Sequence, residues 1–164
     1  QSVMLDRWDT SHLLSLLERP RRIGVALIRL SGYSVGVFEN ESLVSSKTGT
    51  RFVKARHRKG GSSSSRFARR RQVQTMKLID EACRVIRDQF HRFEGSLDHL
   101  FLGGDRIALK VLENRCDYLQ RFTKIRSKRI LQVPNPKQTV LEGLPKQIYS
   151  STVLTISYTR EQDV

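Results

Sequence analysis

Acidic residues are absent from a long stretch of this 164-residue chain, because none occurs between Glu41 and Asp80. Over the whole chain, 30 Lys and Arg residues outnumber 16 Asp and Glu residues, which gives a formal net charge of +14 and a pI of about 10.6. Such a basic protein favours a polyanionic partner, nucleic acid or anionic lipid, over neutral surfaces and small acidic molecules. Charge alone does not separate RNA from DNA.

Cysteine is also scarce. Cys83 and Cys116 lie in apolar helical patterns and form no C-x-x-C pair, which argues against both a disulfide framework and a zinc site. No apolar run reaches the roughly 18 residues needed to cross a bilayer. The start of the chain carries Asp6 and Asp9 where a secretion signal has a basic segment. We therefore expect a soluble, cytoplasmic monomer that needs no metal or cofactor and binds no membrane.

The length of the chain suits a single domain with its own hydrophobic core. Trp8 and the leucines up to Leu17 recur at helical spacing before Pro20. Residues 1–20 are therefore expected to form an N-terminal helix packed on the domain, and residues 21–164 to form the domain itself.

The segment after the first helix is typical of β-structure. Apolar runs at residues 23–30, 33–38 and 43–44 are separated by turn signals at residues 31–32 and 39–42. This pattern predicts a three-stranded antiparallel meander.

A long helix is predicted after the meander, beginning near Ser65, because apolar residues up to Phe90 repeat at steps of three and four. The remaining pattern alternates, and predicts a strand at 97–102, a helix at 107–119, a strand at 129–133, a helix at 140–149 and a last strand at 152–158. A meander followed by alternating helices and strands predicts an α/β fold, in which helices pack on a mixed β-sheet.

The acid-free stretch surrounds a glycine–serine run. A solvated charged face normally mixes both signs, so a run of one sign favours phosphate binding. Gly60 and Gly61 permit positive φ and a close backbone approach to a ligand, and the serines add small donors and acceptors. The alternative is a flexible linker between a strand and a helix. The expected RNA-binding residues are Arg51, Lys54, Arg56, Arg58, Lys59, Arg66, Arg69, Arg70 and Arg71.

Other polar residues allow competing interpretations. His57 sits in the basic stretch, and His91 and His99 lack the spacing of metal ligands. Asp98 and Asp105 near strand ends leave a metal-dependent nuclease open as a weak alternative. Asp105, after two glycines, is better interpreted as a helix N-cap than as part of a phosphate-binding turn. A second basic cluster either extends an RNA footprint or is a solvated helix end, and comprises Arg121, Lys124, Arg126, Lys128 and Arg129.

A family resemblance rests on residues 58–71, with the sequence RKGGSSSSRFARRR, and on the preceding strand at 32–38, with the sequence GYSVGVF. Together they resemble the release-factor-like domain of the Vms-type peptidyl-tRNA hydrolases, which is related to the middle domain of eukaryotic and archaeal class-one release factors. The similarity extends from about Leu13 to Leu154 and includes the turn at residues 102–105.

The resemblance implies a ribonuclease-H-like mixed sheet and a glycine loop that enters the peptidyl-transferase centre. There the family hydrolyses the ester that joins a nascent peptide to its transfer RNA. The implied partners are the large ribosomal subunit, ribosomal RNA and peptidyl-tRNA. The loop needs only to position water and to stabilise the developing oxyanion. The positions that the resemblance assigns to catalysis are Gly60, Gly61, Ser62, Ser63, Ser64 and Ser65.

One position departs from the family pattern. Loops of that family carry a glutamine after the glycines, whereas serines stand here and the first glutamine is Gln72, roughly 10 Å further along a helix. Three alternatives remain open: a loop that works through backbone amides and serine hydroxyls, a non-catalytic ribosome- or RNA-binding module, and a sequence in which the glutamine was replaced.

Overall fold

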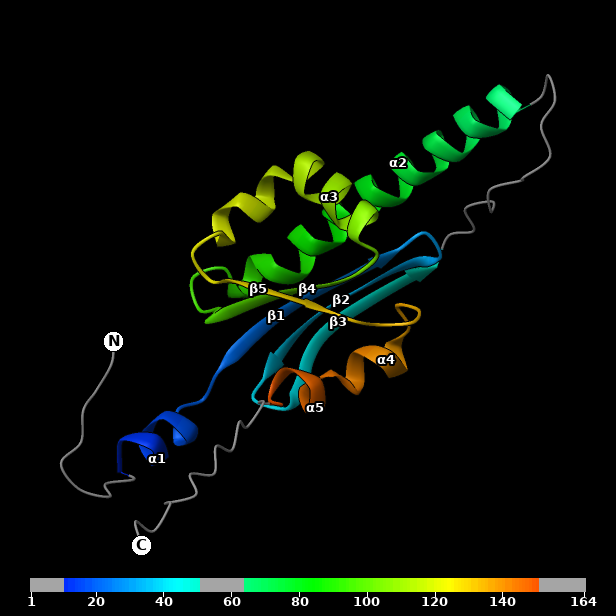
Figure 1. Ribbon diagram of the computed structural model, residues 1–164. Coiled ribbons are helices and arrows are strands. Elements are labelled where there is room, and N and C mark those ends of the chain that lie inside the picture. The colour runs from blue at the N-terminus through cyan, green and yellow to red at the C-terminus, as the bar shows by residue number, and fades with distance from the viewer. Residues whose placement is uncertain (1–10, 51–63, 151–164) are drawn as a thin grey trace, which may run out of the picture.

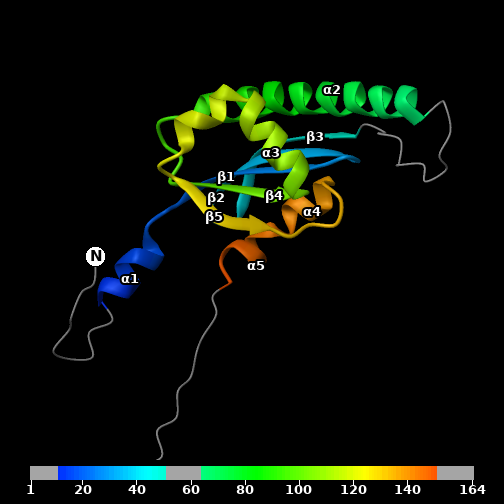
Figure 2. The same ribbon diagram turned by 45° about the horizontal axis from the view of Figure 1, so that its top comes forward.

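The computed structural model describes residues 11–50 and 64–150. They form a mixed five-stranded sheet with the strand order β3-β2-β1-β4-β5, covered by helices on both faces (Figures 1 and 2). The strands are β1 Arg22–Arg29, β2 Gly32–Glu39, β3 Ser42–Thr50, β4 His99–Gly104 and β5 Arg126–Leu131. The predicted α/β architecture is therefore confirmed.

The predicted meander is confirmed by antiparallel pairing of β1 with β2 and of β2 with β3. Strand β4 then pairs in parallel with β1, and β5 pairs in parallel with β4. Both outer pairings are irregular: the register shifts between Val37 and Phe38 in the β2–β3 ladder, and between Leu100 and Leu102 in the β4–β5 ladder. The six inner residues of β1 are all buried, because helices cover both faces of this central strand.

The helices divide between the two faces of the sheet (Figure 2). One face packs against α2 and α3 around Phe90, Leu100 and Leu112, and the other packs against α4 and α5 around Leu131 and Leu141. The helical elements are α1 Ser11–Glu18, α2 Ser64–Phe90, the 3₁₀ helix η1 His91–Phe93, α3 Arg106–Arg115, the 3₁₀ helix η2 Asp117–Phe122, α4 Gln138–Glu142 and α5 Leu144–Ile148.

Two predicted helices differ from the structure. The helix expected at 107–119 ends at Arg115 and continues as a 3₁₀ helix after Cys116. The helix expected at 140–149 is divided at Gly143, and Pro145 lies in the first turn of the second piece, where its missing N–H costs no hydrogen bond.

Other expectations are only partly tested. The N-terminal helix is observed as α1, but its packing on the domain stays a prediction. The strand expected at 152–158 lies outside the described residues. Among the helices that the structure describes, none is long and apolar enough to cross a membrane.

The prediction that the cysteines form no disulfide is wrong. Cys83 of α2 and Cys116, which caps the C-terminus of α3, are bonded, with a Cα–Cα distance of 5.5 Å. The two helices pack on the same face of the sheet, so their apolar sides bring the cysteines together. Spacing along the chain does not reveal such a pair, because 33 positions separate the two residues.

Reduction of the Cys83–Cys116 bond is expected to lower the free energy of unfolding by about 3–4 kcal/mol, because the bond closes a loop of 33 residues in the unfolded chain. Urea unfolding followed by circular dichroism, with and without a thiol reductant, measures the change. The control is Cys83→Ala/Cys116→Ala, whose unfolding midpoint should not respond to the reductant. An equal midpoint for the oxidised and reduced chain would contradict the prediction.

The turn that follows β4 is tight, as expected. Gly104 has a φ of 111°, and a Cβ at this position would overlap the carbonyl oxygen of Ile28. Asp105 then caps α3, since its side chain accepts a hydrogen bond of 2.9 Å from the amide of Ala108. The N-cap interpretation of Asp105 is confirmed.

Candidate nucleic-acid interface

The long helix α2 has two unlike halves. Its 27 residues correspond to about 40 Å of helix. The first buried residue that the structure describes in α2 is Leu78, and the half from there to Phe90 packs on β2 and α3. The other half, from Ser64 to Lys77, contains the N-terminal turns of α2, which extend beyond the sheet (Figures 1 and 2). This projecting half contains five cations and no acidic residue.

The arginines of the projecting half are available to a ligand. Arg66, Arg69 and Arg70 are exposed, and Arg71 is half-buried. Within the described part of the chain, the side chains of Arg66, Arg69 and Arg70 form no hydrogen bond or ion pair. The first acidic residue along the helix, Asp80, already pairs with Arg115 at 2.7 Å. The positive field of this half is therefore not neutralised locally.

The start of α2 adds to this field. The first amides of a helix lack partners within the helix, and the helix dipole places partial positive charge there. Ser64 and Ser65 occupy this first turn, and Ser65 is exposed. Such a terminus is a favourable place for an anion.

The buried half of α2 is fixed to the meander by polar contacts as well as by packing. The hydroxyl of Tyr33 donates to Glu81 at 3.1 Å, and that of Ser45 donates to Gln89 at 2.6 Å. Gly49 lies directly against the ring of Tyr33, where any Cβ would overlap the ring. The two hydrogen bonds join α2 to β2 and to β3.

Some of the predicted site residues lie in the part of the chain that the structure describes, and the others lie outside it. Strand β3 ends at Thr50 and α2 begins at Ser64, at the same end of the sheet (Figure 1). The described site residues are Ser64, Ser65, Arg66, Arg69, Arg70 and Arg71, all on α2. The others lie outside the described residues, and are Arg51, Lys54, Arg56, Arg58, Lys59, Gly60, Gly61, Ser62 and Ser63.

The second basic cluster is not a single helix end, although Arg121 lies in the last turn of η2. Its residues lie on η2, on β5 and between them. Arg121 donates to Glu94 at 2.6 Å, and Arg126 donates to Glu113 at 3.0 Å. Arg129 bonds the hydroxyl of Ser150 at 3.2 Å. Three of its five cations therefore have partners that the sequence did not reveal.

One of these pairs perturbs two ionisable groups. The hydrogen bond from Arg121 lowers the pKa of Glu94. Burial, reinforced by the 3.1 Å hydrogen bond to Glu94, raises the pKa of Tyr118 to about 12. Both carboxylate oxygens of Glu94 are used, so this cluster ties η2 to the C-terminal end of η1.

The described acids and histidines do not assemble a metal site. Asp98 precedes β4 and Asp105 follows it, so the length of the strand, about 20 Å, separates them. Asp98 accepts from the amide of Arg22 at 2.9 Å, while Asp105 caps α3. Across residues 11–50 and 64–150, no group of three or more His, Cys, Asp or Glu side chains could hold a metal ion. The nuclease alternative has no described carboxylate pair to support it.

The described histidines have structural surroundings. His91 is exposed beside Glu94 at 3.8 Å, and His99 contacts the guanidinium of Arg21 at 3.3 Å. His57, which the sequence places in the basic stretch, lies outside the described residues.

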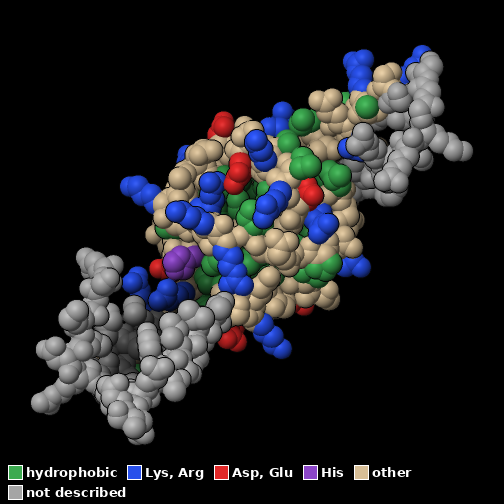
Figure 3. All heavy atoms as spheres, in the orientation of Figure 1, with side chains coloured by type: hydrophobic (Ala, Val, Ile, Leu, Met, Phe, Trp, Pro, Cys, Tyr) green, Lys and Arg blue, Asp and Glu red, His purple; other side chains and the backbone are tan. Residues whose placement is uncertain are grey.

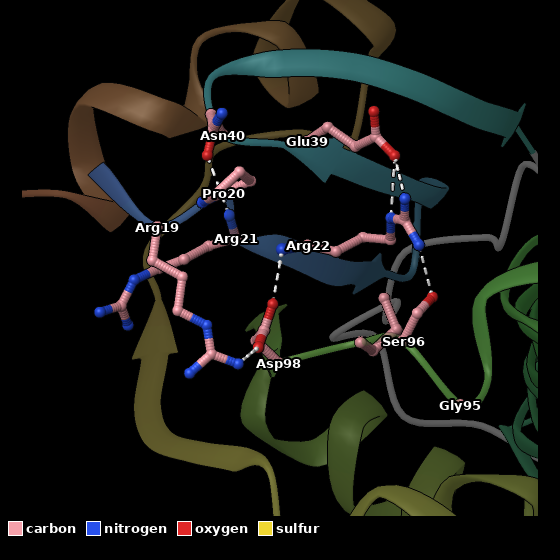
Figure 4. Close-up of a pocket in the computed structure, with 10 residues that line it drawn as sticks. Arg19, Pro20, Arg21, Arg22, Glu39, Asn40, Gly95, Ser96 and Asp98 are labelled. Carbon is pink, nitrogen blue, oxygen red and sulfur yellow. Dashed lines mark hydrogen bonds and ion pairs between the residues drawn. The ribbon is translucent and has the colours of Figure 1, made fainter. Parts of the chain in front are cut away.

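A shallow cavity of about 470 Å³ lies at the end of the sheet opposite to the start of α2 (Figure 4). The sequence did not indicate this cavity. Its polar walls are largely paired with each other. Arg22 bonds Glu39 and also donates to Ser96 at 2.6 Å, and Arg19 lies 3.6 Å from Asp98. The cavity is therefore a polar junction between the starts of β1 and β4.

Comparison with solved structures gives the same fold. The archaeal translation termination factor aRF1 is similar over 88% of this chain and 39% of its own, at 18% identity and a TM-score of 0.51. A second structure, described as an archaeal protein, matches over 88% of this chain and 38% of its own, at 17% identity and a TM-score of 0.49. The chain thus spans less than half the length of these proteins. The likeness to aRF1 shows the fold alone, and confirms the expected architecture of a release-factor domain.

Comparison with protein families is more specific. The chain has no significant match among curated proteins. The family model described as Actinobacteria/chloroflexi VLRF1 release factor, acVLRF1, matches residues 21–154, which is most of the chain. The match includes β1, the acid-free stretch, α2 and the turn after β4. The chain belongs to the acVLRF1 release factor family.

Proposed function

We propose that this chain acts on the ribosome, in translation termination or in the rescue of stalled ribosomes, as a release-factor-like peptidyl-tRNA hydrolase. The proposal is supported above all by the projecting half of α2, whose arginines have no acidic partner among the described residues. Membership of the release factor family and the fold shared with aRF1 agree with it.

Two parts of the acid-free stretch are proposed to have different roles, one in RNA binding and the other in catalysis. The projecting half of α2, about 20 Å from Ser64 to Lys77, holds arginines that bind the phosphates of ribosomal RNA. The glycine–serine run follows β3 in the sequence, extends into the first turn of this helix, and is proposed to enter the peptidyl-transferase centre of the large subunit.

The chemistry that this role requires is modest. The ester of peptidyl-tRNA is already activated, so the loop has to position a water molecule and to stabilise the developing oxyanion. Gly60 and Gly61 would allow backbone amides to approach the reacting carbonyl. In the family that the sequence resembles, a glutamine side chain after the glycines supplies hydrogen-bond donors. Here the hydroxyls of residues 62–65 would supply them. This role requires no metal or cofactor, and a cytoplasmic monomer suffices for it.

The test of catalysis is peptide release from stalled ribosome complexes that carry labelled peptidyl-tRNA. The full chain should release the peptide faster than background, and should sediment with the same complexes. The absence of release with intact sedimentation would contradict the hydrolase proposal.

The arginines of α2 are tested by Arg66→Ala/Arg70→Ala. This variant should weaken binding to the stalled complex and reduce the slope of log affinity against log salt by about two, since about one unit is lost per phosphate contact. The matched control, Arg92→Ala/Lys146→Ala, removes two exposed cations from other elements. Equal effects of the two variants would show that net charge, and not the position of the arginines, governs binding.

The second candidate is a non-catalytic module that occupies the same ribosomal site. It is favoured by the absence of glutamine between Gly61 and Gln72. It predicts salt-sensitive binding without release, so the sedimentation and release assays together separate the two candidates.

A further inference from the structure

A second set of cations lies on the side of α3 that is turned toward β5. The ion pair of Glu113 with Arg126, at 3.0 Å, joins the two elements and identifies this side of the helix. Arg106 and Lys110 precede Glu113 by seven and three residues, so they lie on the same side of α3. The helix therefore presents a row of two cations next to β5.

Strand β5 continues this row. Arg129 points to the face of α5, where it bonds Ser150. Its neighbour Lys128 is exposed and lies two residues after Arg126, which pairs with Glu113 of α3. Lys124 precedes the strand and is exposed. We name Arg106, Lys110, Lys124 and Lys128 the α3–β5 strip.

The charges of the α3–β5 strip are not compensated. All four side chains are exposed, and none has a hydrogen-bond or ion-pair partner within the described ranges. The carboxylates of α3 and its cap are engaged, Asp105 with the amide of Ala108 and Glu113 with Arg126. Figure 3 shows the face formed by α3, η2 and β5, across which Lys and Arg side chains outnumber acidic ones. A ligand for this strip should be a polyanion.

The surroundings of the strip favour one kind of polyanion. Single-stranded RNA is usually held by bases stacked on exposed aromatic rings. The rings nearest in sequence, Tyr118 and Phe122, are 7% and 2% exposed, and thus cannot serve as a stacking platform. Cations without such rings suit the backbone of an RNA helix, which proteins contact through its phosphates and 2′-hydroxyls.

The strip also leads toward the end of the sheet at which β3 ends and α2 begins. Strand β4 runs parallel to β1, and β3 has the same direction, so Arg106 after β4 lies at the end of the sheet where β3 ends. The opposite end of the strip, at Lys124, lies near the start of β5. An RNA helix along the strip would therefore lead toward the end of the sheet from which α2 projects.

We propose that the α3–β5 strip binds the phosphate backbone of a double-helical RNA segment adjacent to the RNA contacted by α2. The position of this RNA rests on the proposed ribosomal function, whereas the preference for an RNA helix rests on the strip itself.

The test is fluorescence anisotropy of the full chain with two labelled probes, a stable RNA hairpin and an unstructured oligouridine of equal length, over a salt series. Lys110→Ala/Lys128→Ala should weaken hairpin binding by about tenfold and lower the salt slope by about two. The affinity of this variant for oligouridine should fall no more than that of the control, Arg92→Ala/Lys146→Ala. Thermal unfolding verifies that both variants remain folded.

Two results would overturn the inference. If the control variant weakens hairpin binding as much as the strip variant does, the effect comes from net charge alone. If the strip variant loses hairpin and oligouridine equally, the strip does not select a helix. This experiment measures RNA binding and not peptide release. Neither result therefore depends on whether the chain is a hydrolase.

Discussion

Replacement of both loop glycines, as Gly60→Ala/Gly61→Ala, is expected to lower the rate of peptide release from stalled complexes by at least about 100-fold. Loss of a single oxyanion donor commonly costs 100-fold to 1,000-fold in rate. Two added methyl groups would restrict the backbone from positive φ and keep its amides away from the reacting carbonyl. The rate constant of release at saturating protein is the quantity to measure.

The effect on binding separates this role from a structural one. Sedimentation with the ribosome should change little, because the arginines and not the glycines are proposed to supply the phosphate contacts. Gly95→Ala is the matched control, since a Cβ at Gly95 meets no heavy atom within 4 Å. Release by the double variant at the wild-type rate would contradict the proposal that Gly60 and Gly61 take part in catalysis. If the wild-type rate is low, Gln introduced at each of positions 62–65 in turn would identify the position that the glutamine occupies in the resembling family.

Gly104→Ala is expected to lower the free energy of unfolding by about 3–5 kcal/mol, a large part of the stability of a typical domain. The backbone at Gly104 has a φ of 111°, which side-chain-bearing residues rarely adopt, and the new Cβ would overlap the carbonyl oxygen of Ile28. That carbonyl also accepts the amide of Asp105 at 2.9 Å, so relief of the overlap would disturb the bond at the start of α3.

Urea unfolding monitored by circular dichroism measures the loss at Gly104. The matched control is Gly143→Ala: Gly143 has a helical φ of −80°, and its Cβ would meet other atoms only at ordinary distances of 3.6 Å and more. The control should be neutral or slightly stabilising. Unchanged stability of Gly104→Ala would mean that the turn adopts another conformation.

Local patterns predicted the elements that depend on local physics. The apolar runs of β1 and β2 and the helical repeat of α2 identified elements whose residues are buried together. The turn signals between these elements fixed the meander. Asp105 could be identified as a cap because capping joins residues only three positions apart.

Contacts between distant segments were not predictable in the same way. The Cys83–Cys116 bond depends on how α2 and α3 pack, and the pair of Glu94 with Arg121 joins residues 27 positions apart. The second basic cluster looked uniform in sequence, yet the fold pairs Arg126 with Glu113 and leaves Lys128 exposed. The division into engaged and available cations required the three-dimensional structure.

The irregular pairing of β3 with β2 and of β5 with β4 affects how readily two copies of the domain can associate through their strands. Unpaired backbone groups on an outermost strand can recruit another chain, and proteins discourage this with local irregularity and with charge. Here β3 and β5 each pair inward through a shifted register, and each carries exposed cations, Lys47 on β3 and Lys128 on β5. Among the described strands, this irregularity and charge discourage the edge of β3 or β5 from pairing with the same edge of another copy.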